Sequence, residues 1–270
     1  MPKDSKKKYE KELYFRGHLD CLYFYSKHIK ELSSFLKAKE IATKIHIPPN
    51  GVFLRRGSKD EPLFVQELNE KNLSQRFFEL RTKVKRHEAI ANRLLTKVQA
   101  KIWLYFPPNK PVEFFYATNG EGPGKKIERI FIDLDRTNLS TEKAKIAAQQ
   151  LIEVIKNDEA FNKLLKFKTK VLFTGSSYHV YLLLKKPVSH EFYEKYISYS
   201  KNEESPCFIT KWAEEITSKT GIRVSGGHEK IKNIIILDPS GTPSGKLARV
   251  PFSVHVKDDK VDGICEFVEL

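Results

Sequence analysis

The chain has 270 residues, 40% hydrophobic and 11% aromatic, so it can bury a sizeable core and is not a disordered segment. Its 48 Lys and Arg against 34 Asp and Glu give a net charge of +14, which indicates a polyanionic partner, either nucleic acid or an acidic membrane surface. No apolar window is long enough to span a bilayer, and the lysine-rich start is not a secretory signal. Three scattered cysteines argue against a disulfide framework or a zinc knuckle, so we expect an intracellular protein of the cytoplasm or nucleoid, not bound to a membrane.

The basic charge is concentrated in residues 1–100, which hold 22 Lys and Arg against 12 Asp and Glu. Apolar residues recur at helical spacing over 9–41 and over 67–100, on either side of a Pro-Pro-Asn-Gly turn at 48–51. We expect residues 1–100 to form a basic, mainly helical N-terminal part of the same domain as a core at 101–270. The cations expected to bind nucleic-acid phosphates are Arg55, Arg56, Lys59, Lys83 and Arg86, with Arg81, Lys85 and Arg93 on the same basic surface.

After residue 100 the pattern becomes one of strands. Aromatic and β-branched residues over 102–106, 112–117 and 127–135 predict three strands, and Ser140 can cap the helix that follows. Further on, the pattern predicts two strands within 171–184, helices at 189–199 and 207–219, and strands at 232–238 and 247–256. We expect an α+β fold with a mixed, mostly antiparallel sheet flanked by helices.

Two carboxylates end the strand at 127–135. Side chains alternate faces along a strand, so Asp133 and Asp135 point the same way while Ile132 and Leu134 enter the core. Close carboxylates repel unless a cation separates them, and their hard oxygens suit Mg²⁺ or Mn²⁺. The spacing alone leaves open that they simply end a strand. Asp238 ends a second apolar strand, and with the first two it supplies the third acidic ligand that two-metal phosphoryl transfer uses.

A glycine turn and a later basic segment carry groups suited to a triphosphate. Ser177 and His179 lie two apart on one strand face after Gly175, and Lys246 and Arg249 are cations in or beside a glycine turn. Taken singly, His179 also fits a hydrogen-bonded core histidine, and Lys246 a solvated turn residue.

In combination these motifs resemble those of the archaeo-eukaryotic primase superfamily. Asp133-Leu134-Asp135, Ser177-Tyr178-His179 and Leu237-Asp238 fall in the order and spacing of its motifs I, II and III. The run from Asp238 through Gly245-Lys246 to Ser253 is similar to the polymerase domain of the bacterial end-joining ligase D. The stretch from Arg249 to His255 is closer to the Arg-x-Pro-x-Ser-x-His of primase small subunits.

The resemblance implies a primase-type catalytic core that synthesises DNA or RNA on a template, as a primase or as a repair polymerase. Asp133, Asp135 and Asp238 would hold two Mg²⁺ or Mn²⁺ ions. The residues implied to bind the NTP or dNTP are Ser176, Ser177, His179, Lys246, Arg249 and Ser253. Template and primer DNA (or RNA) would be partners, together with a ligase, a helicase or a primase large subunit.

Two features depart from the family pattern. No zinc-binding insert is present, and Ser176 stands where a Lys or Arg often accompanies the motif II serine. Two other classes of protein stay open: a metal-dependent nuclease, which needs no triphosphate site, and a non-catalytic nucleic-acid-binding protein with a primase-like fold.

Overall fold

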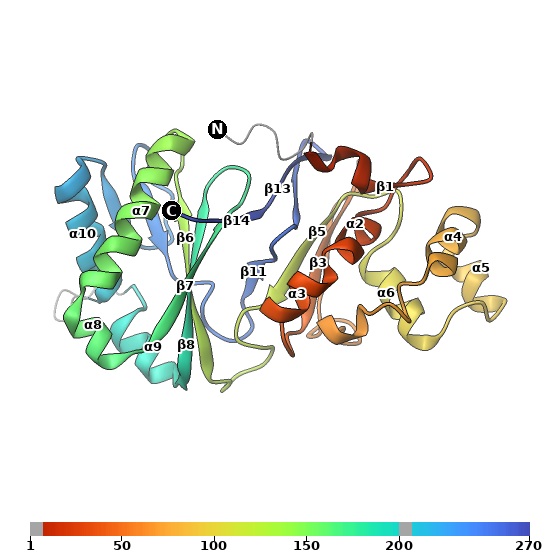
Figure 1. Cartoon of the computed structure of the whole chain (residues 1–270), viewed down its shortest axis with the longest axis horizontal. Helices are drawn as coiled ribbons and strands as arrows, with labels where there is room; N and C mark the ends of the chain where they lie inside the picture. The colour runs from red at the N-terminus through yellow and green to blue at the C-terminus, as the bar shows by residue number, and fades with distance from the viewer. Residues whose placement is uncertain (1–7, 200–206) are drawn as a thin grey trace. The chain divides into compact units, whose positions relative to one another are not determined.

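The computed structural model describes residues 8–199 and 207–270, so most of the lysine-rich start lies outside the described part. The chain forms two compact units (Figure 1). Unit 1 comprises Met1–Ala117 and Arg249–Cys265, and unit 2 comprises Thr118–Ala248 and Glu266–Leu270. The chain therefore leaves unit 1 after Ala117, returns to it at Arg249 and ends in unit 2. In the described residues, no helix has both the length and the apolar character needed to cross a membrane.

Unit 1 combines short helices with antiparallel strands. Its elements are η1 (Glu10–Leu13), β1 (Tyr14–Phe15), β2 (His18–Leu19), α2 (Cys21–Lys27), α3 (Ile29–Phe35), β3 (Ile41–Ile47), β4 (Gly51–Arg55), η2 (Val65–Glu67), α4 (Gln75–Lys83), α5 (Arg86–Ala91), α6 (Lys97–Tyr105), β5 (Val112–Ala117), β12 (Val254–Lys257) and β13 (Lys260–Ile264). Strand β3 lies between β4 and β5, antiparallel to both, and β12 pairs with β13. The strand predicted at 112–117 is confirmed, and β3 and β4 lie between the two segments in which helical spacing was expected, 9–41 and 67–100.

The predicted strand at 102–106 is wrong, because residues 102–105 belong to helix α6 and Phe106 is its C-cap. The helix is started by a capping box, in which the Thr96 hydroxyl accepts the Gln99 N–H and the Gln99 side chain accepts the Thr96 N–H. Its aromatic residues Trp103 and Tyr105 are both buried, on different sides of the helix. Aromatic and β-branched residues serve a buried helix face as well as a strand, so here the cap outweighs the composition.

Unit 2 is built on one six-stranded sheet. Its elements are β6 (Ile127–Asp135), α7 (Thr141–Asn157), α8 (Glu159–Leu164), β7 (Phe167–Phe173), β8 (Tyr178–Val188), α9 (His190–Tyr196), α10 (Phe208–Thr220), β9 (Val224–Gly226), β10 (Ile235–Asp238) and β14 (Glu266–Val268). The strand order is β14-β7-β8-β6-β10-β9, and every pair is antiparallel except the parallel pair β10–β9. The predicted α+β fold with a mixed, mostly antiparallel sheet flanked by helices is confirmed.

One face of this sheet forms the core of unit 2. Ile130, Ile132 and Leu134 of β6 are buried in one apolar cluster with residues of α7 and α10. Figure 1 shows α7, α8 and α10 together on one side of the β6, β7 and β8 strands. Because side chains alternate along β6, its other residues project from the opposite face, and these include Asp133 and Asp135.

The single strand predicted over 247–256 is in fact two strands, β11 (Leu247–Arg249) and β12, separated by a turn. Pro251 has no N–H for a sheet ladder, and Phe252 has a φ of 65°, in the left-handed region. The Phe252 ring stacks on His28 at 4.0 Å between ring centroids, and its N–H is bonded to the Cys265 carbonyl. Packing within unit 1 thus stabilises a backbone conformation that a strand pattern does not predict.

Candidate active site

Three neighbouring strands of unit 2 bring the predicted site residues together on one face of the sheet. Strands β6 and β10 carry the aspartates, and β8 carries His179. Asp133 of β6 is directly opposite Asp238 of β10 on one side and His179 of β8 on the other. Directly opposed residues of antiparallel strands point to the same face, so these three side chains form a row across the sheet. Asp135, two residues along β6, projects from the same face. Three sequence motifs, each more than forty residues from the next, are therefore joined by strand pairing alone.

Asp133 is at the centre of this row and is accessible to solvent. Its side chain is 40% exposed, and its Oδ1 is 3.4 Å from Nε2 of His179. The His179 ring is buried and makes a T-shaped contact with Phe131, with ring centroids 4.9 Å apart. The imidazole is thus held by packing on one side and faces a partly exposed carboxylate on the other.

Each of the other two carboxylates has its own partner. One oxygen of Asp135 accepts the Thr137 N–H at 3.0 Å, and the other lies 2.9 Å from the ammonium group of Lys230. That hydrogen bond raises the pKa of Lys230, so the lysine is charged at neutral pH. Asp238 accepts the N–H of Ser240 at 2.8 Å in a turn that starts directly after the strand.

The turn after Asp238 is fixed by its contacts with β6. The Thr242 hydroxyl accepts the N–H of Phe131 and donates to its carbonyl, so it replaces a strand partner where β10 has ended. Gly241 packs on the Phe131 ring so closely that a Cβ would lie 2.5 Å from a ring atom. Only glycine fits there, which explains a Gly-Thr sequence in this turn.

The donor chemistry of this face fits a divalent cation, but the side chains do not enclose one as they stand. Across residues 8–199 and 207–270, no three His, Cys, Asp or Glu side chains are grouped closely enough to hold a metal ion. Asp135 is bonded to Lys230, and Asp238 is bonded to the turn that follows it. Three carboxylates on one face still match the oxygen ligands that Mg²⁺ and Mn²⁺ prefer.

The motif II turn has a cation that the sequence did not indicate. Arg136, directly after the second aspartate, donates from Nε to the Ser176 carbonyl at 2.7 Å and from Nη1 to the Leu139 carbonyl. A guanidinium therefore lies beside Ser176, where the family pattern often has a basic residue in the turn itself. Its neighbour Ser177 is buried and donates its hydroxyl to the Leu134 carbonyl. The sequence offered one clue to this role that the prediction did not use: Arg136 directly follows the Asp133-Leu134-Asp135 motif.

The remaining predicted triphosphate ligands are divided between the units. Lys246 belongs to unit 2 and is exposed, and its backbone carbonyl accepts the Thr118 N–H at 3.0 Å. Arg249 and Ser253 belong to unit 1.

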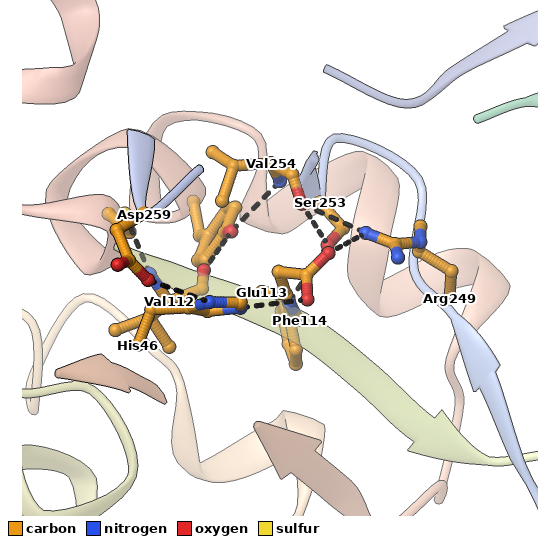
Figure 2. A network of polar contacts seen from close by, with 10 residues as sticks. His46, Val112, Glu113, Phe114, Arg249, Ser253, Val254 and Asp259 are labelled. Atoms are coloured by element: carbon orange, nitrogen blue, oxygen red, sulfur yellow. Dashed lines mark hydrogen bonds and ion pairs between the residues drawn. The ribbon is translucent and has the colours of Figure 1, made fainter. Parts of the chain in front are cut away.

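Figure 2 shows Arg249 and Ser253 within a polar network of unit 1. Arg249 donates to a carboxylate oxygen of Glu113 and to the Val254 carbonyl, and Glu113 also contacts His46 at 3.1 Å. Ser253 is fully buried and accepts the Phe114 N–H at 2.8 Å. Burial alone would raise the pKa of the Glu113 carboxyl, but Arg249 and His46 outweigh it and hold that pKa below its ordinary value.

The predicted nucleic-acid-binding cations lie in unit 1, on two segments. Lys83 and Arg86 line a cavity of about 510 Å³. Burial and then the nearby charge of Arg55 lower the pKa of Arg86, so the basic loop and this cavity are electrostatically linked. Arg55 is held by Asp60 at 3.0 Å, while Lys59 is exposed and Arg56 is half-buried in the same loop.

Arg81, expected on the basic surface, is instead buried. Its guanidinium makes two hydrogen bonds of 2.8 Å with Asp20 and one of 2.7 Å with the Phe106 carbonyl. It also lies over the rings of Phe77 and Trp103. The charge of Arg81 is thus neutralised inside unit 1, and the expectation of a surface role is wrong.

Comparison with known proteins supports the fold. The sequence matches no protein-family model and no curated protein. Among solved structures, the chain is similar to the polymerase domain from Mycobacterium tuberculosis Ligase D in complex with DNA, with a TM-score of 0.51 and 14% sequence identity. The alignment covers 90% of this chain and 78% of that one. At this identity the likeness is one of fold alone.

Proposed function

We propose that this protein is a template-dependent nucleotidyltransferase whose active site is the Asp133, Asp135 and Asp238 face of unit 2. The observation that carries the proposal is the row in which Asp133 lies between Asp238 and His179. Like-charged carboxylates that share one face repel each other without a cation, and phosphoryl transfer with divalent ions uses such a set. The similar fold of a polymerase domain solved with DNA supports the same class of reaction.

In this mechanism the three carboxylates would hold Mg²⁺ or Mn²⁺, which supplies activation of the attacking 3′-hydroxyl and neutralisation of the leaving pyrophosphate. Lys230 must leave Asp135 for both of that carboxylate's oxygens to become available. Lys246 and the guanidinium of Arg136 would bind phosphate oxygens of the NTP or dNTP through charge-assisted hydrogen bonds. His179, 3.4 Å from Asp133, would orient that carboxylate or donate to a phosphate oxygen.

In this proposal Ser177 does not contact the nucleotide. Its hydroxyl donates to the Leu134 carbonyl and so fixes the turn before β8 against β6. Ser176 offers its hydroxyl and N–H beside Arg136. Arg249 is bonded to Glu113 and to the Val254 carbonyl, and the buried hydroxyl of Ser253 supports the backbone of β5. The proposal places catalysis in residues 101–270 and binding of the strand in the basic first hundred residues.

Template and primer strands would contact the cations of unit 1, Arg55, Arg56, Lys59, Lys83 and Arg86. Such contacts are made to phosphates, so binding would weaken steeply with salt and depend little on base sequence. The Glu67 and Glu79 carboxylates near them already have cationic partners, which limits repulsion of a strand.

The test is extension of a labelled primer on a gapped template with Mg²⁺ or Mn²⁺ and each nucleotide set, beside an unprimed single-stranded template. Product in primed lanes alone identifies a repair-type polymerase, and product in both identifies a primase-polymerase. Asp133→Asn, similar in shape but uncharged, should lower incorporation about 10³-fold, since metal stabilisation contributes several kcal/mol and each 1.36 kcal/mol is tenfold.

Glu214→Gln is the matched control, because this exposed carboxylate on α10 lies on the helical side of the sheet. Both variants should retain wild-type DNA binding. Equal incorporation by Asp133→Asn and wild type contradicts the assignment of the site. Absence of product with DNA still bound favours the non-catalytic binding protein, and triphosphate-independent cleavage of the template favours the nuclease.

A further inference from the structure

A second charged feature of unit 2 lies at the other end of the sheet from the carboxylate row. A cavity of about 780 Å³ is lined by residues of α7, α8, β7 and β14 and by the ends of the strands next to them. Five lysines line it, namely Lys156, Lys166, Lys168, Lys170 and Lys185, and all five are exposed. None of the five makes an ion pair with a carboxylate in the described part of the chain. One acidic side chain, Glu269, is also on the lining.

Strand geometry arranges three of these lysines in a line. Lys166, Lys168 and Lys170 alternate along the chain through β7, so they project from one face at intervals of about 6.6 Å. Lys185 donates its backbone N–H to the Lys166 carbonyl at 2.8 Å, which places these two lysines opposite each other next to the Phe167–Leu184 pair. Directly opposed like charges destabilise a strand pair unless an anion lies between them.

The length of the line favours a polymer over a single phosphate. From Lys166 to Lys170 the strand rises about 13 Å, which is more than one phosphate group can bridge. Lysines spaced along about 13 Å of chain can contact several phosphates of one nucleic-acid strand, which carries one charge per about 3.4 Å of helix axis.

An aromatic side chain completes the surface. Phe267 of β14 lines the same cavity and is 38% exposed, although phenylalanine is among the residues most often found in the core. The ammonium group of Lys170 lies 5.5 Å from the centre of its ring. Aromatic rings next to a line of cations are the combination that binds single-stranded nucleic acid, through base stacking and phosphate contacts.

We propose that this cavity, the lysine groove, binds the backbone of a single-stranded nucleic acid, with Phe267 as a stacking platform for a base. The proposal deepens the proposed function, on which it rests for the choice of a template strand as the polymer. The groove is separated along the sheet from the carboxylates: Lys168 is level with Arg129, and Asp133 lies about 13 Å further along β6. A template strand bound here would be held by unit 2 independently of the cations of unit 1.

The test measures binding of a fluorescein-labelled oligo(dT) 20-mer by anisotropy between 50 and 200 mM salt. Each phosphate contact on a single strand contributes about 0.7 to the slope of log affinity against log salt, so Lys168→Gln/Lys170→Gln should reduce the slope by about 1.4. Over this salt range, wild type should therefore lose about sevenfold more affinity than the double variant. Phe267→Leu should weaken binding by about fivefold or more without changing the slope.

Lys186→Gln is the matched control. This exposed lysine adjoins Lys185 on the same strand but projects from the opposite face, so its slope should equal that of wild type. An unchanged slope in the double variant, in a protein with the wild-type melting temperature, overturns the proposal. Equally effective competition by polyglutamate of the same charge overturns the choice of nucleic acid. Because the readout is binding, a protein that fails primer extension can still satisfy this test.

Discussion

Charged side chains are used in opposite ways in the two units. In unit 1, Asp20 with Arg81 and Glu113 with Arg249 are oppositely charged pairs joined by direct hydrogen bonds; all of these side chains are buried except that of Arg249, which is half-buried. In unit 2, the aspartates of β6 and β10 share one face without sharing a partner, and the central one, Asp133, is 40% exposed. The buried pairs bring opposite charges into direct contact inside the fold, whereas Asp133, Asp135 and Asp238 place three like charges on one face of a sheet, each with a different polar neighbour.

The comparison also bears on Arg81, which is buried although its sequence context is that of an exposed basic face. Arg81 occurs among Lys83, Lys85 and Arg86, a pattern typical of a solvent-exposed basic face. In α4, however, it is directed at Asp20, which also caps α2 by accepting the N–H groups of Leu22 and Tyr23. A charged residue within a basic run can therefore be structural, and only the partner distinguishes the two cases.

The largest effect is expected at the buried pair. Arg81→Met should lower the free energy of unfolding by about 3–5 kcal/mol, because it leaves the Asp20 carboxylate buried without its counter-ion. Urea denaturation measures this loss. Adding Asp20→Asn should recover part of it, since asparagine still caps α2 and carries no charge. Arg76→Met, at an exposed position of the same helix, should stay within 0.5 kcal/mol of wild type. If Arg81→Met loses no more unfolding free energy than Arg76→Met, the buried pair of Asp20 and Arg81 does not stabilise unit 1 as proposed.

A second effect is expected in the pH dependence of stability. The pKa of Glu113 in the folded protein lies below its ordinary value of 4.5, because Arg249 and His46 outweigh the cost of burial. Its contribution to stability is therefore present above about pH 4.5 and is lost as the pH falls through the lower folded-state pKa.

Glu113→Gln should accordingly be less stable than wild type at neutral pH, and the difference should shrink as the solution is acidified. Denaturation curves at a series of pH values measure it. Glu70→Gln, which removes an exposed carboxylate from unit 1, should show no such convergence. A difference that is constant with pH rules out a role for the Glu113 charge.

The smallest effect is expected in unit 2, at the contact between Lys230 and Asp135. Lys230 is 77% exposed, so its bond to Asp135 contributes at most about 1 kcal/mol. Lys230→Met should therefore raise the affinity for Mn²⁺ by up to about fivefold, because the ion no longer competes with the lysine. Titration of free Mn²⁺ by electron paramagnetic resonance measures this without an activity assay.

Lys232→Met is the control for the loss of one positive charge from the same loop. If both variants gain affinity equally, the effect is one of general charge and not of the Asp135 contact. Unaltered affinity in Lys230→Met indicates that Lys230 does not occupy the position of the ion.

Most elements of unit 2 could be predicted from its sequence. The strand at 127–135 has its predicted bounds, and Ser140 caps α7 through the Lys143 N–H as expected. These elements have strong local signals, a clear apolar alternation and a capping side chain. Unit 1 was less predictable because its elements are short and its aromatic residues occur in both helices and strands, as α6 and β5 illustrate.

The candidate site, too, could be predicted from the sequence only in part. Alternation along one strand was enough to put Asp133 and Asp135 on one face, and this required no knowledge of any other strand. The neighbours of Asp133 on β8 and β10 depend on the order of strands in the sheet, which local patterns do not encode. The same holds for Arg136 beside Ser176 and Lys230 beside Asp135.

By itself, the sequence determined the basic charge, the α+β composition and the direction of the paired aspartates, because each depends on residue type and spacing over a few positions. The tertiary structure decided which opposite charges meet in pairs, which carboxylates share one sheet face, and that five lysines line one groove. Burial and pairing arise from contacts between residues distant in the chain, as between Asp20 and Arg81, and such contacts exist only once the strands and helices have packed.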